Sequence, residues 1–418
     1  MFRFLTPLAL LGAGLPVHAQ SAAAPDRPLD LQQAIALALQ ANAQLAAAGH
    51  ELQASAGAAL QASAIPNPTV SFEVQDTRRA TRETTMQVSQ PIELGGKRAY
   101  RTAVAGKAQE TAALQLQAKR LEVRADVSKA FFGVLIAEER MKLANASLLN
   151  AGRATTVAAK RVLAGKISPV DEDKARVAEA VVRLELLQAT SDLATARAQL
   201  AALWGSRTVN FSRIAGTLEG VPVLPPLEVL VQRLASAPAL LAARSDSERH
   251  AALASLEKSR RIGDVAVSLG VKRSEELGRN QAIVGFSMPL PLFDRNQGAV
   301  LESLRRLDKS RDEVDAAALA LHAELLQAHA RFEVARQQVA AMREDILPRA
   351  TSALDAATTG FEFGKFALID VLDAQRTLLQ TRSHYLQALG ELHRAAADID
   401  KLAGPALAAA PMTERVSP

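Results

Sequence analysis

The chain of 418 residues contains no cysteine, which excludes disulfide bonds, thiolate zinc sites, a cysteine nucleophile and a lipid anchor on an N-terminal cysteine. Aromatic residues are also scarce, at 4%, although hydrophobic residues reach 49%. The apolar content is therefore mostly Ala, Leu and Val. This composition favours long, closely packed helices over an aromatic-rich β core.

Further absences narrow the class of function. After residue 19 there is no apolar run of roughly 18 residues, so no membrane-spanning helix is expected. The net charge of +5 is small beside 49 basic and 44 acidic residues, and the scattered basic residues argue against nucleic-acid binding. No nucleophile elbow, phosphate loop or cluster of metal ligands appears, so we expect neither an enzyme nor a bound cofactor.

Residues 1–19 have the pattern of a cleavable secretory signal. Arg3 precedes an apolar run up to Leu15, and Ala19 ends the segment. The alternative is an ordinary buried helix. Export without a spanning helix leaves three classes: a periplasmic protein, a secreted protein, or an outer-membrane β-barrel.

The first half of the mature chain is dominated by helical periodicity. Residues 29–63 carry a helical pattern, which Pro66 and Pro68 end. From residue 97 to residue 163 a second helical pattern is almost unbroken, and at about 1.5 Å per residue it would extend roughly 100 Å. That length indicates a coiled coil or a tube. A returning helix is expected from Pro169 to Trp204, with an apolar seven-residue spacing.

Between the first two helices the period changes to two, which predicts a hairpin with one apolar and one polar face. Its strands approach the roughly 9 to 11 residues that a tilted strand needs to cross a bilayer. Covering a soluble core is the alternative. If the hairpin crosses a membrane, lipid should face Val70, Phe72 and Val74, or their opposite-face neighbours if the register is shifted by one.

The second half repeats this order after a Pro/Gly-rich linker at residues 206–226. We expect helix at Leu227–Arg260, strands at 265–271 and 282–290, a helix capped by Asp294 with Gln297 and kinked at Pro348, and a returning helix at Leu368–Leu402. Two pairs of positions, Gly165 with Gly364 and Leu203 with Leu402, are both 199 residues apart. The chain is therefore an internal duplication, with repeats at 20–205 and 227–404 and a tail at 405–418.

Each repeat sends its long helix back through a Gly-Lys turn. Glycine can adopt the left-handed conformation that ends a helix, and proline is tolerated in the first turn of the next one. In both repeats an aspartate lies six residues after the glycine. The turn residues are Gly165, Lys166, Ile167 and Ser168 in the first repeat and Gly364, Lys365 and Phe366 in the second; the acids are Asp171, Asp370 and Asp373.

A signal segment, two copies of helix, hairpin, very long helix, turn and helix, and a Pro-rich joint resemble the TolC family of outer-membrane efflux factors. The resemblance covers nearly the whole mature chain. The sharpest matches are Asp-Val-Leu-Asp-Ala at 370–374, Gln-Pro-Ile-Glu-Leu-Gly-Gly-Lys-Arg at 90–98 and Pro-Leu-Pro-Leu-Phe-Asp-Arg-Asn-Gln at 289–297. The last two resemble the heavy-metal branch, which serves cobalt, zinc and cadmium efflux.

This resemblance implies a mainly α fold with a small β part. Coiled coils would form a periplasmic α-barrel, and four strands per protomer would contribute to the 12-stranded transmembrane β-barrel of a homotrimer. Strand counting permits the trimer, because four strands cannot close a barrel and about eight leave room only for side chains. The implied function is passive conduction of divalent cations of the cobalt, zinc, cadmium or nickel type.

The implied location is the outer membrane of a Gram-negative bacterium, in contact with its lipid. The implied partners are a periplasmic adaptor protein and an inner-membrane, proton-driven pump of the resistance-nodulation-division class. The turns, Gly165 to Ser168 and Gly364 to Phe366, would form the periplasmic tips that meet the adaptor. A solvated loop without a partner is the alternative.

By the same resemblance Asp171, Asp370 and Asp373 line the periplasmic constriction, where rings of acids would attract cations. The alternative is that carboxylates in a first helical turn only complement the helix dipole. The family's best-known gate has an arginine two residues after the second glycine, where this chain has Phe366. A salt-bridge lock of that design is therefore not expected, and Phe361 or Phe366 could narrow the pore instead.

The mature chain has six histidines, all interpreted as surface or packing residues without a chelating role. Two competing functions remain open at this stage. One is the same duct serving organic drugs or exported polypeptides, because a wide tunnel has little selectivity of its own. The other is a secreted coiled-coil structural protein whose hairpins are interaction elements.

Overall fold

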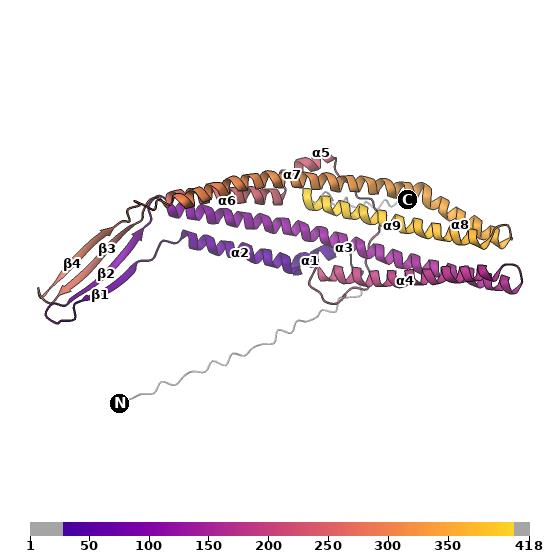
Figure 1. Ribbon diagram of the computed structural model, residues 1–418, viewed down its shortest axis with the longest axis horizontal. Helices are drawn as coiled ribbons and strands as arrows, with labels where there is room; N and C mark the ends of the chain where they lie inside the picture. The colour runs from indigo at the N-terminus through magenta and orange to yellow at the C-terminus, as the bar shows by residue number, and fades with distance from the viewer. Residues whose placement is uncertain (1–27, 405–418) are drawn as a thin grey trace, which may run out of the picture.

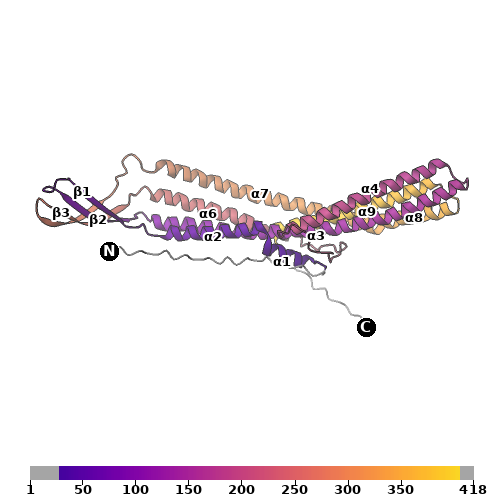
Figure 2. The same ribbon diagram turned by 90° about the horizontal axis from the view of Figure 1, so that it is seen from below.

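The computed structural model describes residues 28–404 (Figures 1 and 2). The predicted signal at 1–19 and tail at 405–418 lie outside the described residues. A four-stranded sheet lies at one end of an elongated helical body, and two helical turns lie at the other end (Figure 1). No helix within residues 28–404 is long and apolar enough to cross a membrane.

Four helices, including one very long one, make up most of the described part of the first repeat, residues 28–205. They are α1 (Leu31–Ala41), α2 (Ala43–Ser63), α3 (Lys97–Leu163) and α4 (Pro169–Ala202). The 67 residues of α3 extend about 100 Å at 1.5 Å per residue. The prediction of one helix over 29–63 was wrong at Asn42, whose extended backbone ends α1. Its side chain accepts a hydrogen bond from the Leu45 N–H and so caps α2.

The second half has the same order with more interruptions. Its helices are α5 (Leu227–Leu234), α6 (Pro238–Ser259), α7 (Gln297–Ala341), α8 (Leu347–Glu362) and α9 (Leu368–Ala403). The single helix predicted over 227–260 is divided before Pro238, which begins α6. The interruption predicted at Pro348 is a π turn, η1 (Met342–Ile346), directly before α8. Pro348 has no N–H for the regular i→i−4 bond, which accounts for the change of pitch.

The predicted cap of α7 was wrong. The N-cap residue is Asn296, with a left-handed φ of 58°. The Asp294 side chain accepts from the Asn296 N–H at 2.8 Å, and the Gln297 side chain accepts from the Arg295 N–H at 2.8 Å. Both side chains therefore stabilise the connection before the helix instead of the first turn inside it.

The sheet joins one hairpin from each repeat. Its strands, all antiparallel in the order β1-β2-β3-β4, are β1 (Thr69–Gln75), β2 (Glu83–Ile92), β3 (Val265–Ser274) and β4 (Arg279–Ser287). The predicted last strand extended to residue 290, but β4 ends at Ser287, two residues before Pro289. Strands β1 and β4 are the free edges of this sheet.

The strand register separates an apolar from a polar face. Phe72 lies opposite Met86, and Met86 lies opposite Val271 in the next strand. Leu269 lies opposite Val284 in the same way. Because side chains alternate along a strand, Val70, Phe72 and Val74 share the apolar face, as the sequence predicted. The polar face carries mainly Ser, Thr, Gln and Gly.

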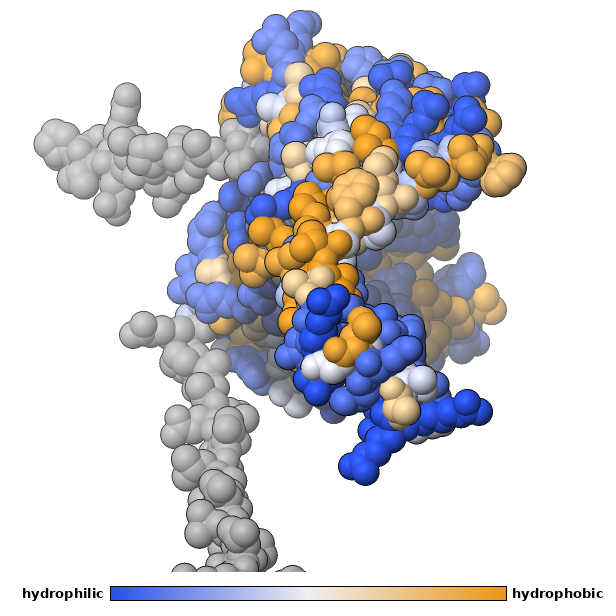
Figure 3. All heavy atoms as spheres, turned by 90° about the vertical axis from the view of Figure 1, so that its left-hand side faces the viewer, coloured by the Kyte–Doolittle hydropathy of each residue, from blue (hydrophilic) through white to orange (hydrophobic). Residues whose placement is uncertain are grey.

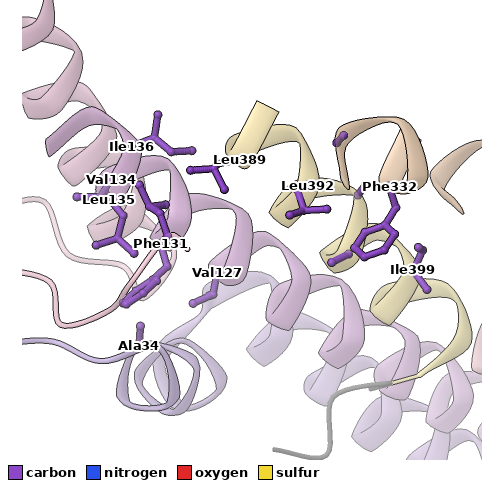
Figure 4. Packing of buried hydrophobic residues seen from close by; sticks show 14 of the residues in the cluster. Ala34, Val127, Phe131, Val134, Leu135, Ile136, Phe332, Leu389, Leu392 and Ile399 are labelled. Carbon is purple, nitrogen blue, oxygen red and sulfur yellow. The ribbon is translucent and has the colours of Figure 1, made fainter. Parts of the chain in front are cut away.

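The largest core lies where α3, α7 and α9 meet α1, α5 and the linker (Figure 4). One apolar stripe of α3 is buried in this core: Val123, Val127, Phe131 and Val134. Helix α9 packs between α3 and α7, and α4 packs against α3. The linker covers α3 closely, since a Cβ added at Gly216 would lie 3.1 Å from the Leu135 side chain.

Two long edges of the helical body, formed by α4 and α7, expose apolar side chains in a single chain. On α4 the seven-residue row predicted from the sequence is exposed: Val170, Val177 and Leu184. The opposite edge, on α7, also exposes isolated apolar side chains, including Leu319 and Val334. A wall of helices with an apolar row along one edge fits an assembly of several copies better than a monomer.

Candidate functional site: the two Gly-Lys turns

The turn between α3 and α4 ends the long helix with two hydrogen bonds, in which N–H groups just past the helix donate to carbonyls of its last turn. The Lys166 N–H donates to the Arg161 carbonyl at 2.8 Å, and the Gly165 N–H donates to the Val162 carbonyl at 2.9 Å. Gly165 has a φ of +66°, which glycine adopts without steric cost. The Ser168 hydroxyl then accepts from the Val170 N–H and caps α4.

The turn between α8 and α9 has the same backbone. The Lys365 N–H donates to the Gly360 carbonyl at 2.8 Å, and the Gly364 N–H donates to the Phe361 carbonyl at 2.9 Å. Gly364 has a φ of +73°. These bonds form the same helix-ending motif in both repeats. The N-cap of α9, however, is Ala367, which has no side-chain acceptor.

The two turns lie side by side at one end of the molecule (Figure 1) and share a small apolar core. Four helices contribute to it. Its buried residues are Ala158, Ala175, Ala357, Phe361, Leu368 and Val371. The two turns therefore form one packed unit within a single chain.

Arg161 crosses from the first repeat to the second within this unit. Its guanidinium donates to the carbonyls of Phe361, at 2.9 Å, and Glu362, at 3.2 Å. It also lies 3.9 Å from the centroid of the Phe361 ring. A cation at the carbonyl end of a helix is favourable, because that end carries the negative end of the helix dipole.

The predicted acids lie just inside the turns, in unequal surroundings. The Asp370 side chain accepts from the Ala367 N–H at 2.9 Å, which satisfies the N–H of the N-cap residue itself. The nearest basic atom to Asp171 belongs to Lys174, at 3.8 Å. Asp373 is exposed, and its carboxylate makes no ion pair with the described residues 28–404. Part of the alternative role, complementing a helix start, therefore applies to Asp370.

The two phenylalanines proposed to narrow the pore differ in exposure. Phe361 is 6% exposed and lies under Arg161, so its ring belongs to the core of the turns. Phe366 is 50% exposed and packs over Gly360. A Cβ at Gly360 would lie 2.2 Å from the Phe366 ring. Of the two, Phe366 is the one with a free face.

Sequence reasoning missed Arg161 and Gly360. The duplication itself could have found them, since Arg161 and Gly360 are also 199 residues apart. One copy of this position has the longest basic side chain and the other has no side chain at all. Such a mismatch inside an otherwise matched turn marks a place where the two copies differ in role.

No group of three or more metal-ligating side chains is close enough to hold an ion within residues 28–404. His393 is buried, stacks on Phe132 with ring centroids 3.7 Å apart, and bonds through its ring to the Leu218 carbonyl. Burial lowers the pKa of His393. It is thus a packing residue that fixes the linker, as predicted for the histidines.

Two segments of the chain, residues 34–206 and 229–405, match the family described as outer membrane efflux protein. The repeated match confirms the internal duplication. The cobalt-zinc-cadmium resistance protein CzcC of Cupriavidus metallidurans is 45% identical over 390 residues, which is 93% of either chain. The nickel and cobalt resistance protein CnrC of the same organism is 28% identical over 320 residues, 73% of either chain.

Solved structures share the fold at low sequence identity. The channel CusC has a TM-score of 0.77 at 18% identity and covers 90% of this chain and 92% of its own. The outer membrane protein VceC of Vibrio cholerae also has a TM-score of 0.77 at 18% identity and covers 90% of this chain and 96% of its own. These matches confirm the predicted fold class. With two family matches spanning most of its length, this chain belongs to the outer membrane efflux protein family.

Proposed function

We propose that three copies of this chain form an outer-membrane exit channel that conducts divalent heavy-metal cations of the cobalt, zinc, cadmium or nickel type. The observation that carries the choice of substrate is the 45% identity to the cobalt-zinc-cadmium resistance protein over 93% of the chain. Within residues 28–404 the structure has no metal-chelating cluster, so the choice of substrate rests on this identity.

The sheet supports the assembly. Its free edges, β1 and β4, would pair between neighbouring copies, because an unpaired strand edge presents a row of unused backbone groups. Three sheets of four strands would close as twelve strands around a lumen. The apolar face would then contact lipid, and the polar face would line the pore.

The acids would act where the helical tunnel narrows. Around a threefold axis, Asp171, Asp370 and Asp373 would each appear three times and raise the local concentration of cations. Asp373 is the strongest candidate, because its carboxylate neither caps a helix nor pairs with a described base.

Conductance of the purified trimer in lipid bilayers tests this role. We expect Asp370→Asn combined with Asp373→Asn to lower the preference for cations over anions and to weaken block by divalent ions. Glu185→Gln, which changes an exposed carboxylate on α4 14 residues after Asp171, should leave both unchanged. Unchanged selectivity in the double variant would remove the acids from the conduction mechanism.

The tips would dock a periplasmic adaptor that links the channel to an inner-membrane, proton-driven pump. Exposed side chains at the turns support a protein contact: Leu163, Phe363 and Phe366. Gly364→Trp should abolish metal resistance at normal trimer levels. Gly364→Asn keeps the left-handed backbone with a small side chain and is the matched control. Full resistance with Gly364→Trp would contradict the docking role.

A duct for organic drugs or exported polypeptides is the second candidate, favoured by the absence of a built ion site within residues 28–404. A deletion strain separates the two. Sensitivity to cobalt, zinc or cadmium with unchanged drug tolerance supports the metal duct, and the reverse pattern supports the drug duct. Recovery of the protein in the soluble periplasm, without heat-modifiable migration, would instead indicate a secreted coiled-coil protein.

A further inference from the structure

The connection between β4 and α7 carries unusually exposed apolar side chains at residues 288–293, a segment called the crest below. Figure 2 shows the backbone of this connection looping out between the sheet and the start of α7. Leu290 is 73% exposed, Leu292 63% and Phe293 92%. Three large apolar side chains within four residues are expensive to leave in water, at roughly 25 cal/mol per Å² of apolar surface.

The base of the crest is fixed. A Cβ added at Gly263 would lie 2.8 Å from the Pro289 carbonyl oxygen, so the connection is seated against the segment before β3. The Leu292 N–H donates to the Leu290 carbonyl at 2.9 Å. The Asn296 side chain donates to the Glu257 carbonyl on α6 at 2.9 Å. The apolar side chains are therefore presented by a defined backbone.

The crest follows the apolar face of the sheet along the chain. Val284 and Phe286 lie on that face, opposite Leu269 and Val267. After the strand ends at Ser287, the exposed apolar side chains of Leu290, Leu292 and Phe293 follow within six residues. Figure 3, which looks onto the sheet end, shows apolar side chains gathered along the sheet and a hydrophilic tip below them.

The apolar face of the sheet is too short to span a membrane by itself. On β3 it runs from Val265 to Val271, whose six residue-to-residue steps extend about 20 Å along the strand. A tilt of about 40° reduces this to roughly 15 Å of height, whereas a transmembrane barrel presents an apolar band about 25 Å tall. Roughly 10 Å of apolar height is missing.

The tip of the sheet supplies little of the missing height. The next row on the apolar face has Val74 on β1, but Thr84 on β2 and Arg273 on β3. Beyond it Leu277 is exposed, but so is Arg78 in the β1–β2 connection. The larger group of exposed apolar side chains lies toward the helices, at the crest.

We propose that residues 288–293 insert into the periplasmic leaflet of the outer membrane, among its acyl chains, and complete the apolar band. This inference rests on the proposed function, which places the sheet in a bilayer. Arg295 lies two residues after Phe293, beyond Asp294; it is exposed and makes no ion pair with the described residues 28–404. An aromatic ring with a basic residue nearby is typical of a membrane interface, where the cation reaches lipid phosphate.

A second copy of the chain is the competing occupant. β4 is an edge strand, and the opposite edge exposes Leu60 and Ile65 near the start of β1. Contact with a neighbour would leave the band short, however, and would leave Arg295 without an acidic partner from that segment, since residues 60–68 contain no Asp or Glu. Lipid accounts for both features.

Tryptophan fluorescence of the trimer in vesicles with brominated acyl chains tests the proposal. In a Trp204→Phe background, single tryptophans replace Phe293 on the crest, Val284 on the sheet and Leu319 on α7, which are 92%, 78% and 73% exposed. We expect Phe293→Trp and Val284→Trp to be quenched. Phe293→Trp should respond most to bromines near the headgroup, and Leu319→Trp should not respond.

Three outcomes would overturn the inference or its basis. A quenched Val284→Trp with a solvent-exposed, unquenched Phe293→Trp leaves the channel intact and removes the crest from the membrane. A blue-shifted but unquenched Phe293→Trp assigns the crest to the neighbouring copy. If Val284→Trp is also unquenched, the sheet is not in the bilayer, and the proposed function itself fails.

Discussion

The two Gly-Lys turns have the same backbone but different side-chain supports. Each ends its helix with the same pair of hydrogen bonds to carbonyls of the last helical turn, around a left-handed glycine, Gly165 or Gly364. The first turn has a serine cap and contributes Arg161 to its neighbour. The second has an alanine at the cap and receives that arginine. Both copies keep the turn geometry, but the side chains that stabilise the two turns come from different positions in each copy.

Arg161 and Gly360 show how this division is compatible with one fold. At position 360 the missing side chain leaves room for the Phe366 ring. At position 161 the long side chain reaches the carbonyl end of α8, where Phe361 accepts its hydrogen bond. An arginine in both copies would displace Phe366. The asymmetry is therefore required by packing between the turns.

Filling the empty position should have the largest effect. Gly360→Leu would force the Phe366 ring out of its site, because the Cβ alone lies 2.2 Å from that ring. We expect the second turn to lose about 1–3 kcal/mol of local stability, typical of overpacking. Hydrogen exchange of the amides around residues 357–368 in the intact trimer measures this loss.

Gly152→Leu is the matched control on α3. A Cβ at Gly152 meets nothing within 4 Å, so no ring has to move. Replacing this half-buried helical glycine, which has open space at its Cβ, should leave stability unchanged or raise it by up to about 1 kcal/mol. Equal exchange in the two variants would show that Phe366 does not depend on the space at Gly360.

Removing Arg161 should have the next largest effect, and it should appear in the other repeat. Arg161→Ala loses the hydrogen bonds to the carbonyls of Phe361 and Glu362 and the contact with the Phe361 ring. We expect the end of α8 to lose about 1–2 kcal/mol of local stability. Faster exchange of α8 amides after a change in α3 is the diagnostic result.

Lys160→Ala, at the exposed neighbouring position, is the control for general loss of positive charge. It should leave exchange in α8 unchanged. If both variants accelerate α8 equally, the effect comes from electrostatics at the tip, and Arg161 does not link the repeats through its specific contacts.

The sequence was sufficient for the parts of the molecule that depend on local pattern. The long helices, the paired hairpins, the left-handed glycines and the buried stripe including Val127 and Phe131 all follow from periodicity and turn chemistry. The break at Asn42 was missed because a capping side chain lay inside a continuous helical period. The cap of α7 was missed because Asn296 takes a left-handed backbone that no pattern indicates.

The candidate site was predicted in part. Positions of Asp171, Asp370 and the glycines came from the repeat, but the contact between Arg161 and Phe361 joins residues 200 apart and depends on how two hairpins pack. Periodicity within one element carries no information about such packing. Only the mismatch at the repeat offset, Arg161 against Gly360, could have indicated it.

The smallest expected difference concerns the acids themselves. Asp370→Ala removes the acceptor of the Ala367 N–H and should cost the start of α9 about 1 kcal/mol. Asp171→Ala should cost α4 less, about 0.3–0.5 kcal/mol, because Ser168 still caps that helix. Hydrogen exchange of the first amides of α9 and α4 compares the two variants, and equal losses would contradict the difference between the two helix starts.

Asp370→Asn keeps a side-chain acceptor without the charge. If it preserves exchange but alters conduction, the cap and the cation-attracting role of Asp370 are separate.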